Sequence, residues 1–331
     1  MFDSLLLKEN EVRPALFMAP MAGITHSAFR RLVADFGGYG ALFTEMLSGH
    51  ALLQENIYRS PFTKRRECEG LVVYQLMLKG NESLGSVIER LREVQPAAID
   101  LNLGCPAPKV CKNGAGVSLF GDLDRLSCVL DAIRSSWEGI LTVKCRLGQN
   151  PGTWQKSFEK RLRIFERFGV DAIHVHPRFF DEKLKRCARL HLLGWIASDT
   201  KIPIIANGDI TPDVLMKDNE LSSSGVQGVM IGRMAVVKPW IFQECAGHKP
   251  EIDYAQVWER LYQYVIEDFS PEQAIGRIKA FSVYFARNFF YGHQFFKAVQ
   301  NTATLEDTYE SAMRFLLAGP KVVAQPSVAG I

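Results

Sequence analysis

One cysteine stands where its side chain could take part in a reaction. Cys105 lies between Gly104 and Pro106, just beyond an apolar run that ends at Leu103. An ordinary thiol is mainly protonated near neutral pH, so a positioned thiol can serve as a general acid. A neighbouring cation would instead turn a thiol into a nucleophile. The sequence leaves both roles open, beside the structural alternative that this cysteine is a small buried side chain.

Other polar side chains lie within or just after short apolar runs. Gln75 interrupts one run, Lys144 and Arg146 end another, and His174 and His176 lie two residues apart near a third. A lysine in a buried strand is almost never unpaired, so Lys144 needs a nearby carboxylate or an anionic cofactor. Residues two apart on a regular strand point to the same face of the sheet, so the two histidines would share a face. Both residue types also have purely structural explanations. A histidine here could be a hydrogen-bonded core residue, and Gln75 could cap a neighbouring loop.

Two glycine-containing segments follow the last two runs. They are Asn207-Gly208-Asp209 and Gly232-Arg233. The loops after the last two strands of β/α barrels commonly bind phosphate through backbone N–H groups, and glycine lets the backbone approach a ligand closely. A tight turn alone would also favour glycine.

Strands must position these residues, and eight runs have the near-continuous apolar sequence of parallel strands buried on both faces. Amphipathic stretches, including Ser83–Val94, Leu123–Ile133 and Trp154–Phe168, separate several of the runs. The pattern predicts an α/β fold, a TIM (β/α)8 barrel with its active site at the carboxyl ends of the strands. A doubly wound open sheet is the alternative, but no G-x-G-x-x-G loop follows the first run. The runs are Ala15–Met21, Ala41–Met46, Leu71–Leu78, Ala98–Leu103, Ile140–Cys145, Ala172–Val175, Ile202–Ala206 and Gln227–Ile231.

The pattern changes after Phe242. Strand-like runs stop, and Tyr254–Phe269, Gln273–Phe290 and Thr308–Leu317 have helical periodicity. We therefore predict two domains, a barrel over residues 1–244 and an all-helical domain over residues 245–331.

Composition excludes several classes of protein. The 331 residues are 47% hydrophobic and 23% charged, as in ordinary soluble globular proteins. No apolar run reaches the ~18 residues of a membrane span, and the start lacks the pattern of a signal peptide. A net charge of +3 excludes a strongly basic tail but allows a locally basic face. Seven irregularly spaced cysteines without a C-x-x-C pair indicate reduced thiols and no zinc site. We expect a cytoplasmic monomer without a membrane partner or a metal.

Several motifs occur in a fixed order along the chain. The segment from Asn102 to Lys109 reads N-x-G-C-P-x-x-K and is the most specific. With these motifs the chain resembles the tRNA-dihydrouridine synthase family along nearly its whole length. The other matching segments are Ala19–Thr25, Thr44–Met46, Gly114–Gly116, Val143–Gly148, Val175–Arg178, Ile205–Ile210 and Val229–Arg233.

The resemblance implies an FMN-containing barrel with RNA, expected to be tRNA, in a groove beside the helical domain. It implies that NADPH, or NADH, reduces the flavin, that hydride passes to C6 of a flipped-out uracil, and that Cys105 protonates C5. Asn102 and Arg178 would bind the uracil edge or an RNA phosphate. The implied FMN contacts are Pro20, Met21, Ala22, Gln75, Lys144, His176, Asn207, Gly208, Asp209, Gly232 and Arg233.

The sequence departs from the family pattern on the substrate side. The usual His-Gly-Arg-Thr reads His176-Pro177-Arg178-Phe179 here, no Tyr-Gly segment follows, and His26 stands where the family often has Asp. Three alternatives therefore remain: a small-molecule flavin dehydrogenase of the dihydroorotate or dihydropyrimidine type, a synthase acting on another RNA such as rRNA, and an RNA-binding flavoprotein without catalysis. The first type lacks the N-x-G-C-P-x-x-K loop and would not need the helical domain.

Two basic stretches predict RNA contacts. Arg178–Arg189 holds five cations against two carboxylates and follows the sixth run. Arg277, Lys279 and Arg287 lie in the helical region, among aromatic residues that we expect to be core. Neutralising such cations should flatten the salt dependence of RNA binding.

Overall fold

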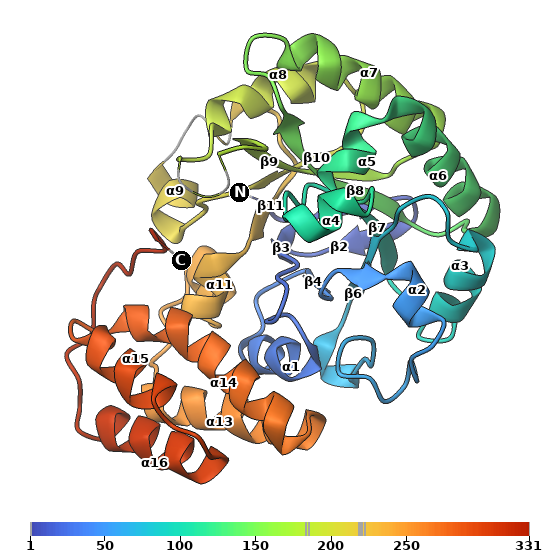
Figure 1. Ribbon diagram of the computed structural model, residues 1–331. Coiled ribbons are helices and arrows are strands. Elements are labelled where there is room, and N and C mark those ends of the chain that lie inside the picture. The colour runs from blue at the N-terminus through green and yellow to red at the C-terminus, as the bar shows by residue number, and fades with distance from the viewer. Residues whose placement is uncertain (1, 183, 185, 218–220, 222, 331) are drawn as a thin grey trace.

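The centre of the computed structural model, which describes residues 2–182, 184, 186–217, 221 and 223–330, is a closed parallel barrel (Figure 1). Neighbouring strands pair in chain order, and the pairs β11–β3 and β4–β6 close the circle. Each predicted apolar run overlaps one barrel strand, which confirms the TIM barrel and excludes the open sheet. The strands are β3 (Leu16–Met18), β4 (Ala41–Phe43), β6 (Val72–Met77), β7 (Ala98–Leu103), β8 (Leu141–Gly148), β9 (Ala172–Phe179), β10 (Ile204–Asn207) and β11 (Gly228–Ile231). A two-residue strand, β5 (Leu47–Ser48), adds to the end of β6.

Helices surround the barrel, and the three predicted amphipathic stretches form α3 (Leu84–Arg92), α6 (Leu123–Ser136) and α7 (Trp154–Arg167). Each turns its apolar stripe inward, because that face has no other way to leave water. None of the described helices is long and apolar enough to cross a bilayer. The other elements are α1 (Ser27–Phe36), α2 (Gly49–Leu52), η1 (Glu67–Glu69), α4 (Pro108–Lys112), α5 (Val117–Gly121), η2 (Leu190–Leu192), α8 (Leu193–Ser198), α9 (Pro212–Lys217), α11 (Arg233–Val237) and α12 (Ile241–Cys245).

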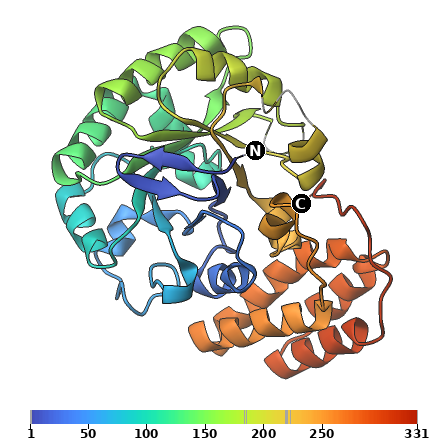
Figure 2. The same ribbon diagram turned by 180° about the vertical axis from the view of Figure 1, so that it is seen from behind.

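A short hairpin that sequence reasoning missed lies across the rear of the barrel, where Figure 2 shows it in dark blue. Its strands are β1 (Leu5–Leu7) and β2 (Asn10–Val12). Leu5, Leu7 and Val12 join the buried cluster that fills the barrel interior. The hairpin therefore covers the amino-terminal end of the barrel, opposite the end where active sites form.

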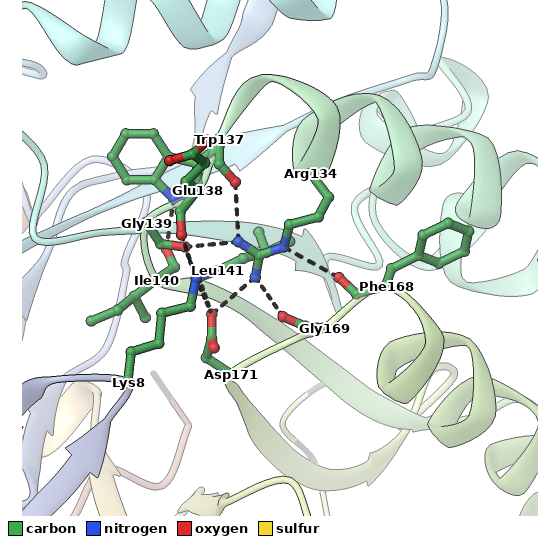
Figure 3. A network of polar contacts seen from close by, with 10 residues as sticks. All are labelled: Lys8, Arg134, Trp137, Glu138, Gly139, Ile140, Leu141, Phe168, Gly169 and Asp171. Atoms are coloured by element: carbon green, nitrogen blue, oxygen red, sulfur yellow. Dashed lines mark hydrogen bonds and ion pairs between the residues drawn. The ribbon is translucent and has the colours of Figure 1, made fainter.

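A polar network ties this rear end together (Figure 3). Arg134, near the end of α6, donates to the carbonyls of Trp137, Gly139, Phe168 and Gly169. Its Nη2 also lies 2.9 Å from the Asp171 carboxylate. Since the acceptors come from the segments that lead into β8 and β9, the network fixes where these two strands begin.

The carboxyl-terminal helices form a bundle on one side of the barrel (Figure 1). Arg31 of α1 pairs with Glu267 at 2.6 Å, and Arg66 pairs with Asp268 at 2.7 Å, so charged contacts join bundle and barrel. One helix, α15, was not predicted, and the division at residues 244 and 245 stays a prediction. The elements are α13 (Tyr254–Asp268), α14 (Pro271–Phe285), η3 (Ala286–Asn288), α15 (Gly292–Gln300) and α16 (Leu305–Leu316).

His26, which departs from the family pattern, begins α1. Its Nδ1 accepts a hydrogen bond from the Phe29 backbone N–H at 3.4 Å, the contact that an N-cap carboxylate would make. Its ring also packs edge-on against Phe269, which follows α13. The histidine thus caps a barrel helix and contacts the helical bundle, which accounts for this departure in structural terms.

Candidate active site

The strand register brings the predicted polar residues together at the carboxyl end of the barrel. Asn102 of β7 pairs with Lys144 of β8, and Lys144 pairs with His174 of β9. Gln75 of β6 pairs with Asp100, two residues before Asn102. Because side chains two apart on a strand share a face, these groups form one surface at the mouth of the barrel.

The two histidines lie at different depths. Strand β9 runs to Phe179, so it extends beyond the predicted end at Val175, and both histidines lie on it. His174 packs edge-on between Phe17 and Phe43, and burial lowers its pKa to about 3. It is therefore a neutral core residue, as the structural alternative held, whereas His176 lies one step nearer the mouth.

Cys105 lies on a loop that is held from both sides. The Asn102 Oδ1 accepts hydrogen bonds from the backbone N–H groups of Gly104 and Cys105, at 3.2 and 3.0 Å. The Cys105 carbonyl accepts from the Val117 N–H at 3.2 Å. A Cβ on Gly116 would come within 2.6 Å of that carbonyl, so only glycine allows this approach. The thiol is free and only half-buried, which argues against a purely core role.

A buried hydrogen-bonded chain leads to this loop from inside the barrel. The Asp100 Oδ2 accepts from Gln75 Nε2 at 2.7 Å, and Gln75 Oε1 accepts from Asn102 Nδ2 at 2.8 Å. Thr142 donates to the other Asp100 oxygen at 2.6 Å. Burial raises the pKa of Asp100 to about 6, although these hydrogen bonds and the charge of Lys144 act in the opposite direction. Sequence reasoning assigned no role to Asp100 or Thr142, although a carboxylate within an apolar run was a signal.

Lys144 is the cation at the mouth. Its ammonium makes no hydrogen bond or ion pair with any residue that the structure describes. Burial lowers its pKa to about 8, the charge of Arg146 adds to this, and Asp100 opposes it. A half-buried ammonium without a bonded partner fits an anionic ligand, so the residues present suit an anionic cofactor here.

A second cluster lies at the ends of β9, β10 and β11. Arg178 donates to His176 Nε2 and to an Asp209 carboxylate oxygen, both at 2.5 Å, and Arg233 donates to the other Asp209 oxygen at 3.1 Å. Burial lowers the pKa of His176 well below its ordinary value. A neutral imidazole that accepts at Nε2 carries its hydrogen on Nδ1, so His176 can donate there.

This cluster changes how two predicted residues are understood. Arg178 is 2% exposed, so its guanidinium is buried against His176 and Asp209 and does not lie on the protein surface. Its predicted contact with the uracil edge or an RNA phosphate stays a prediction. Burial opposes ionisation of Asp209, but the hydrogen bonds and charges of its partners outweigh burial and lower its pKa. With both carboxylate oxygens already bonded, Asp209 orients Arg233 and Arg178.

A cavity of about 1300 Å³ lies beside this cluster. Gly208, Asp209, Gly232 and Arg233 line it, together with the terminal segment 324–330. Its described lining does not include Cys105 or Lys144, so the cavity is at the predicted phosphate end and not over the thiol. A Cβ on Gly208, whose φ is +117°, would lie 2.7 Å from His176 Cδ2.

The remaining predicted cofactor residues lie around the first and last strands. Pro20, Met21 and Ala22 follow β3, and Met21 Sδ is 3.7 Å from where a Gly232 Cβ would stand. Asn207 Nδ2 donates to the Met230 carbonyl at 2.8 Å, which fixes its carboxamide against β11.

The predicted basic segment after β9 is only partly described. Lys183 and Lys185 lie outside the described residues. Arg189 pairs with Glu182, which leaves Arg186 as an exposed cation of this segment.

The cations of the helical bundle also differ from one another. Lys279 donates to the carbonyls of Gln300 and Thr302, so it caps α15 and does not lie free for RNA. Arg277 lies 3.6 Å from Glu45, which follows β4, and therefore links bundle and barrel near the mouth. Arg287 is exposed. The aromatic residues between them are core, as predicted, and include Phe281, Phe285 and Phe289.

Comparison with known proteins identifies the family. The model of the dihydrouridine synthase (Dus) family matches residues 17–315. The chain belongs to the dihydrouridine synthase family. The tRNA-dihydrouridine synthase B of Proteus vulgaris is 30% identical over 267 residues, covering 78% of this chain and 80% of that protein. A probable tRNA-dihydrouridine synthase of Rickettsia conorii is 33% identical over 246 residues, covering 71% and 70%. Members of this family are flavin-dependent oxidoreductases, and so is this chain.

Solved structures resemble this family member in fold. The old yellow enzyme of Trypanosoma cruzi aligns with a TM-score of 0.53 at 9% identity, covering 76% of this chain and 93% of that one. A 2-naphthoyl-CoA reductase aligns with a TM-score of 0.58 at 11% identity, covering 75% and 52%. At such low identity the likeness extends to the barrel fold alone.

Proposed function

We propose that the chain reduces a specific uridine of tRNA to 5,6-dihydrouridine, with FMN as its flavin and NADPH as the reductant. The observation that carries the proposal is the placement of Cys105. Its backbone N–H is bonded to Asn102, at the same end of the barrel as the Lys144 ammonium, which has no hydrogen bond or ion pair among the described residues. The relatives named tRNA-dihydrouridine synthase support tRNA as the RNA. The free cysteines of the described chain suit the reducing cytoplasm, where we propose that the protein works as a monomer.

The residues at the mouth suit a flavin mononucleotide. When bound there, FMN would supply the hydride-transfer chemistry between a nicotinamide and the pyrimidine. Lys144 would hold negative charge on the ring, and Gln75 and His176 would donate hydrogen bonds to it, as would the loop formed by Pro20, Met21 and Ala22. Arg233, Gly208 and Gly232 line the cavity that would take the phosphate, and Asn207 and Asp209 would position that end.

Cys105 would supply the proton that the pyrimidine ring needs. A thiol on a fixed loop can donate a proton to the ring carbon while Asn102 keeps the loop in place. The uracil must leave its stack to reach the mouth, which costs a few kcal/mol. Contacts to the RNA backbone must offset that cost, and Arg186 and Arg287 are exposed and available for them.

The experiment that tests the function separates the two half-reactions in a Cys105→Ala variant. We expect flavin reduction by NADPH to stay near the wild-type rate, and dihydrouridine formation to fall by ~10²–10⁴-fold, the usual contribution of a general acid. Product formation is measured by mass spectrometry of digested tRNA. Wild-type-like product formation by the variant would refute the role of the thiol.

Mass spectrometry of tRNA and rRNA from a deletion strain tests the substrate. Loss of dihydrouridine from tRNA supports the proposal. Loss from rRNA alone would move the substrate to that RNA. Complete retention in every RNA, with turnover of free dihydroorotate or dihydropyrimidine, would favour the small-molecule alternative.

A further inference from the structure

The buried chain from Asp100 to the Cys105 loop has a fixed direction. At one end an ionised carboxylate can only accept hydrogen bonds, and at the other end two backbone N–H groups can only donate. The two carboxamides between these ends must therefore run head to tail. Gln75 turns its NH2 to Asp100, and Asn102 turns its oxygen to Gly104 and Cys105. Both ends require the same arrangement, and the distances agree with it.

The direction of the chain determines which hydrogen-bonding groups of Asn102 remain for a ligand at the mouth of the barrel. Its oxygen already accepts two backbone hydrogen bonds, and one of its amide hydrogens goes to Gln75. An amide oxygen has two lone pairs, so only one N–H remains for a ligand. Asn102 can therefore donate to a pyrimidine carbonyl but cannot accept from a pyrimidine N–H.

We propose that Asp100, assisted by Thr142, is a positioning residue for the reaction because it sets the direction of this chain. It touches neither Cys105 nor a ligand, and acts through Gln75 and Asn102. The proposal rests on the proposed function for its catalytic consequence, but the chain itself can be tested without catalysis. Asp100 is fully buried, and Thr142 holds its second oxygen, so the carboxylate cannot turn away.

The Asp100→Asn substitution keeps the shape of the side chain but no longer fixes the direction of the hydrogen-bonded chain. If its oxygen faces Thr142, its NH2 faces Gln75, both amides reverse, and Asn102 turns its NH2 toward two backbone donors. If its NH2 faces Thr142 instead, that hydroxyl must rotate and accept, and its hydrogen loses the carboxylate. Neither arrangement keeps every hydrogen bond, so the Cys105 loop loses its anchor or the buried hydroxyl hydrogen loses its acceptor.

A double variant tests the direction of the hydrogen-bonded chain without changing its net charge. Asn102→Asp alone places a second acceptor opposite Gln75 and so breaks the chain. In the combined Asp100→Asn, Asn102→Asp protein, the new carboxylate accepts from the loop and from Gln75, Gln75 accepts from the new amide, and that amide accepts from Thr142. Every bond is restored at the same net charge: the two bonds of Gln75 reverse their direction, while the loop N–H groups and Thr142 still donate.

The first measurement is urea unfolding of the two single variants and the double variant. We expect each single variant to unfold at lower urea than the wild type, and the double variant to regain most of the loss. Residues in one network show such coupling, whereas independent sites add. If the two losses of stability simply add in the double variant, the proposed direction of the hydrogen-bonded chain is wrong. This result does not depend on the activity toward RNA.

The second measurement is the rate of each half-reaction in the flavin-loaded Asp100→Asn variant. With pre-reduced enzyme and tRNA, we expect a roughly 10- to 100-fold slower single turnover, since misplacing a reacting group by about 1 Å costs this much. Flavin reduction by NADPH should stay near the wild-type rate. The matched control is Asp171→Asn, a carboxylate paired with Arg134 at the rear of the barrel, which should lower stability but not slow the RNA half-reaction.

The outcomes distinguish the proposal from the function beneath it. Wild-type-like single turnover in Asp100→Asn, with an active wild type, would overturn the positioning role alone. A wild type that forms no dihydrouridine would overturn the proposed function. Urea unfolding of the single and double variants would still test the direction of the hydrogen-bonded chain.

Discussion

Replacing Lys144 by methionine should make the flavin-free protein more stable while weakening its hold on FMN. The lysine is half-buried in the mouth and has no hydrogen bond or ion pair among the described residues, so the nearby Asp100 offsets the burial of its charge only in part. Methionine has a similar length and no charge, so it removes the cost of burying the ammonium and leaves the packing nearly intact.

The magnitude follows from the pKa of Lys144. Burial lowers the pKa from 10.5 to about 8, a difference of about 2.5 units. At ~1.4 kcal/mol for each pKa unit, charged Lys144 costs the fold about 3 kcal/mol. The folded pKa lies below the unfolded one, so the cost is complete below about pH 8 and vanishes above about pH 10.5. The titratable groups that interact with the ammonium are Asp100, Arg146, His174, His176, Cys145 and Cys105.

The assay is urea unfolding of flavin-free protein at two pH values. Near neutral pH we expect Lys144→Met to raise the free energy of unfolding by up to about 3 kcal/mol, and the gain should shrink toward pH 10. Fluorescence titration should show weaker binding of FMN. Lys156→Met is the matched control, because Lys156 is an exposed lysine on α7, and it should change neither quantity. A variant that is no more stable at neutral pH, or whose gain is the same at both pH values, would refute the reasoning.

Three further predictions concern other parts of the structure. Gly208→Ala should lower the flavin content, measured by visible absorbance per protein, because its Cβ would lie 2.7 Å from His176 Cδ2. Arg134→Met at the rear of the barrel should lower the free energy of unfolding by about 2–4 kcal/mol in urea denaturation, and flavin reduction should not change. Replacing Arg186 and Arg287 by glutamine should flatten the salt dependence of tRNA binding, by ~0.7–0.9 for each lost phosphate contact, with flavin content unchanged; an unaltered slope would place the RNA elsewhere.

The sequence was a good guide to the barrel because burial on both faces leaves a strong local signal. Each apolar run overlaps a strand, since most side chains of such a strand pack against buried surfaces on both faces of the sheet. The extension of β9 to Phe179 was not visible, because Pro177 and Arg178 are poor strand formers and their place depends on pairing with β8. The hairpin at the rear was missed for a similar reason, as strands of three residues carry too little pattern.

The site was predictable where a residue type itself implied chemistry. Cys105 and Lys144 drew attention because each stands where its type is unusual. The role of Asp100 depends on its register with Gln75, and the burial of Arg178 depends on Asp209, which is distant in sequence. Such contacts arise from strand order, which a single sequence does not specify.

Buried cations at the two ends of the barrel differ in whether the protein itself supplies hydrogen-bond partners for them. At the rear, Arg134 finds four carbonyls and a carboxylate, so its charge strengthens the fold with no ligand present. At the mouth, Lys144 has no bonded partner among the described residues, and the charge of Arg146 adds to the cost of burying it. An anionic ligand at the mouth would therefore compensate the charge of Lys144, and its binding would stabilise the folded state by an amount that grows with the logarithm of its affinity. The proposed flavin site accounts for a buried charge that the fold alone would disfavour.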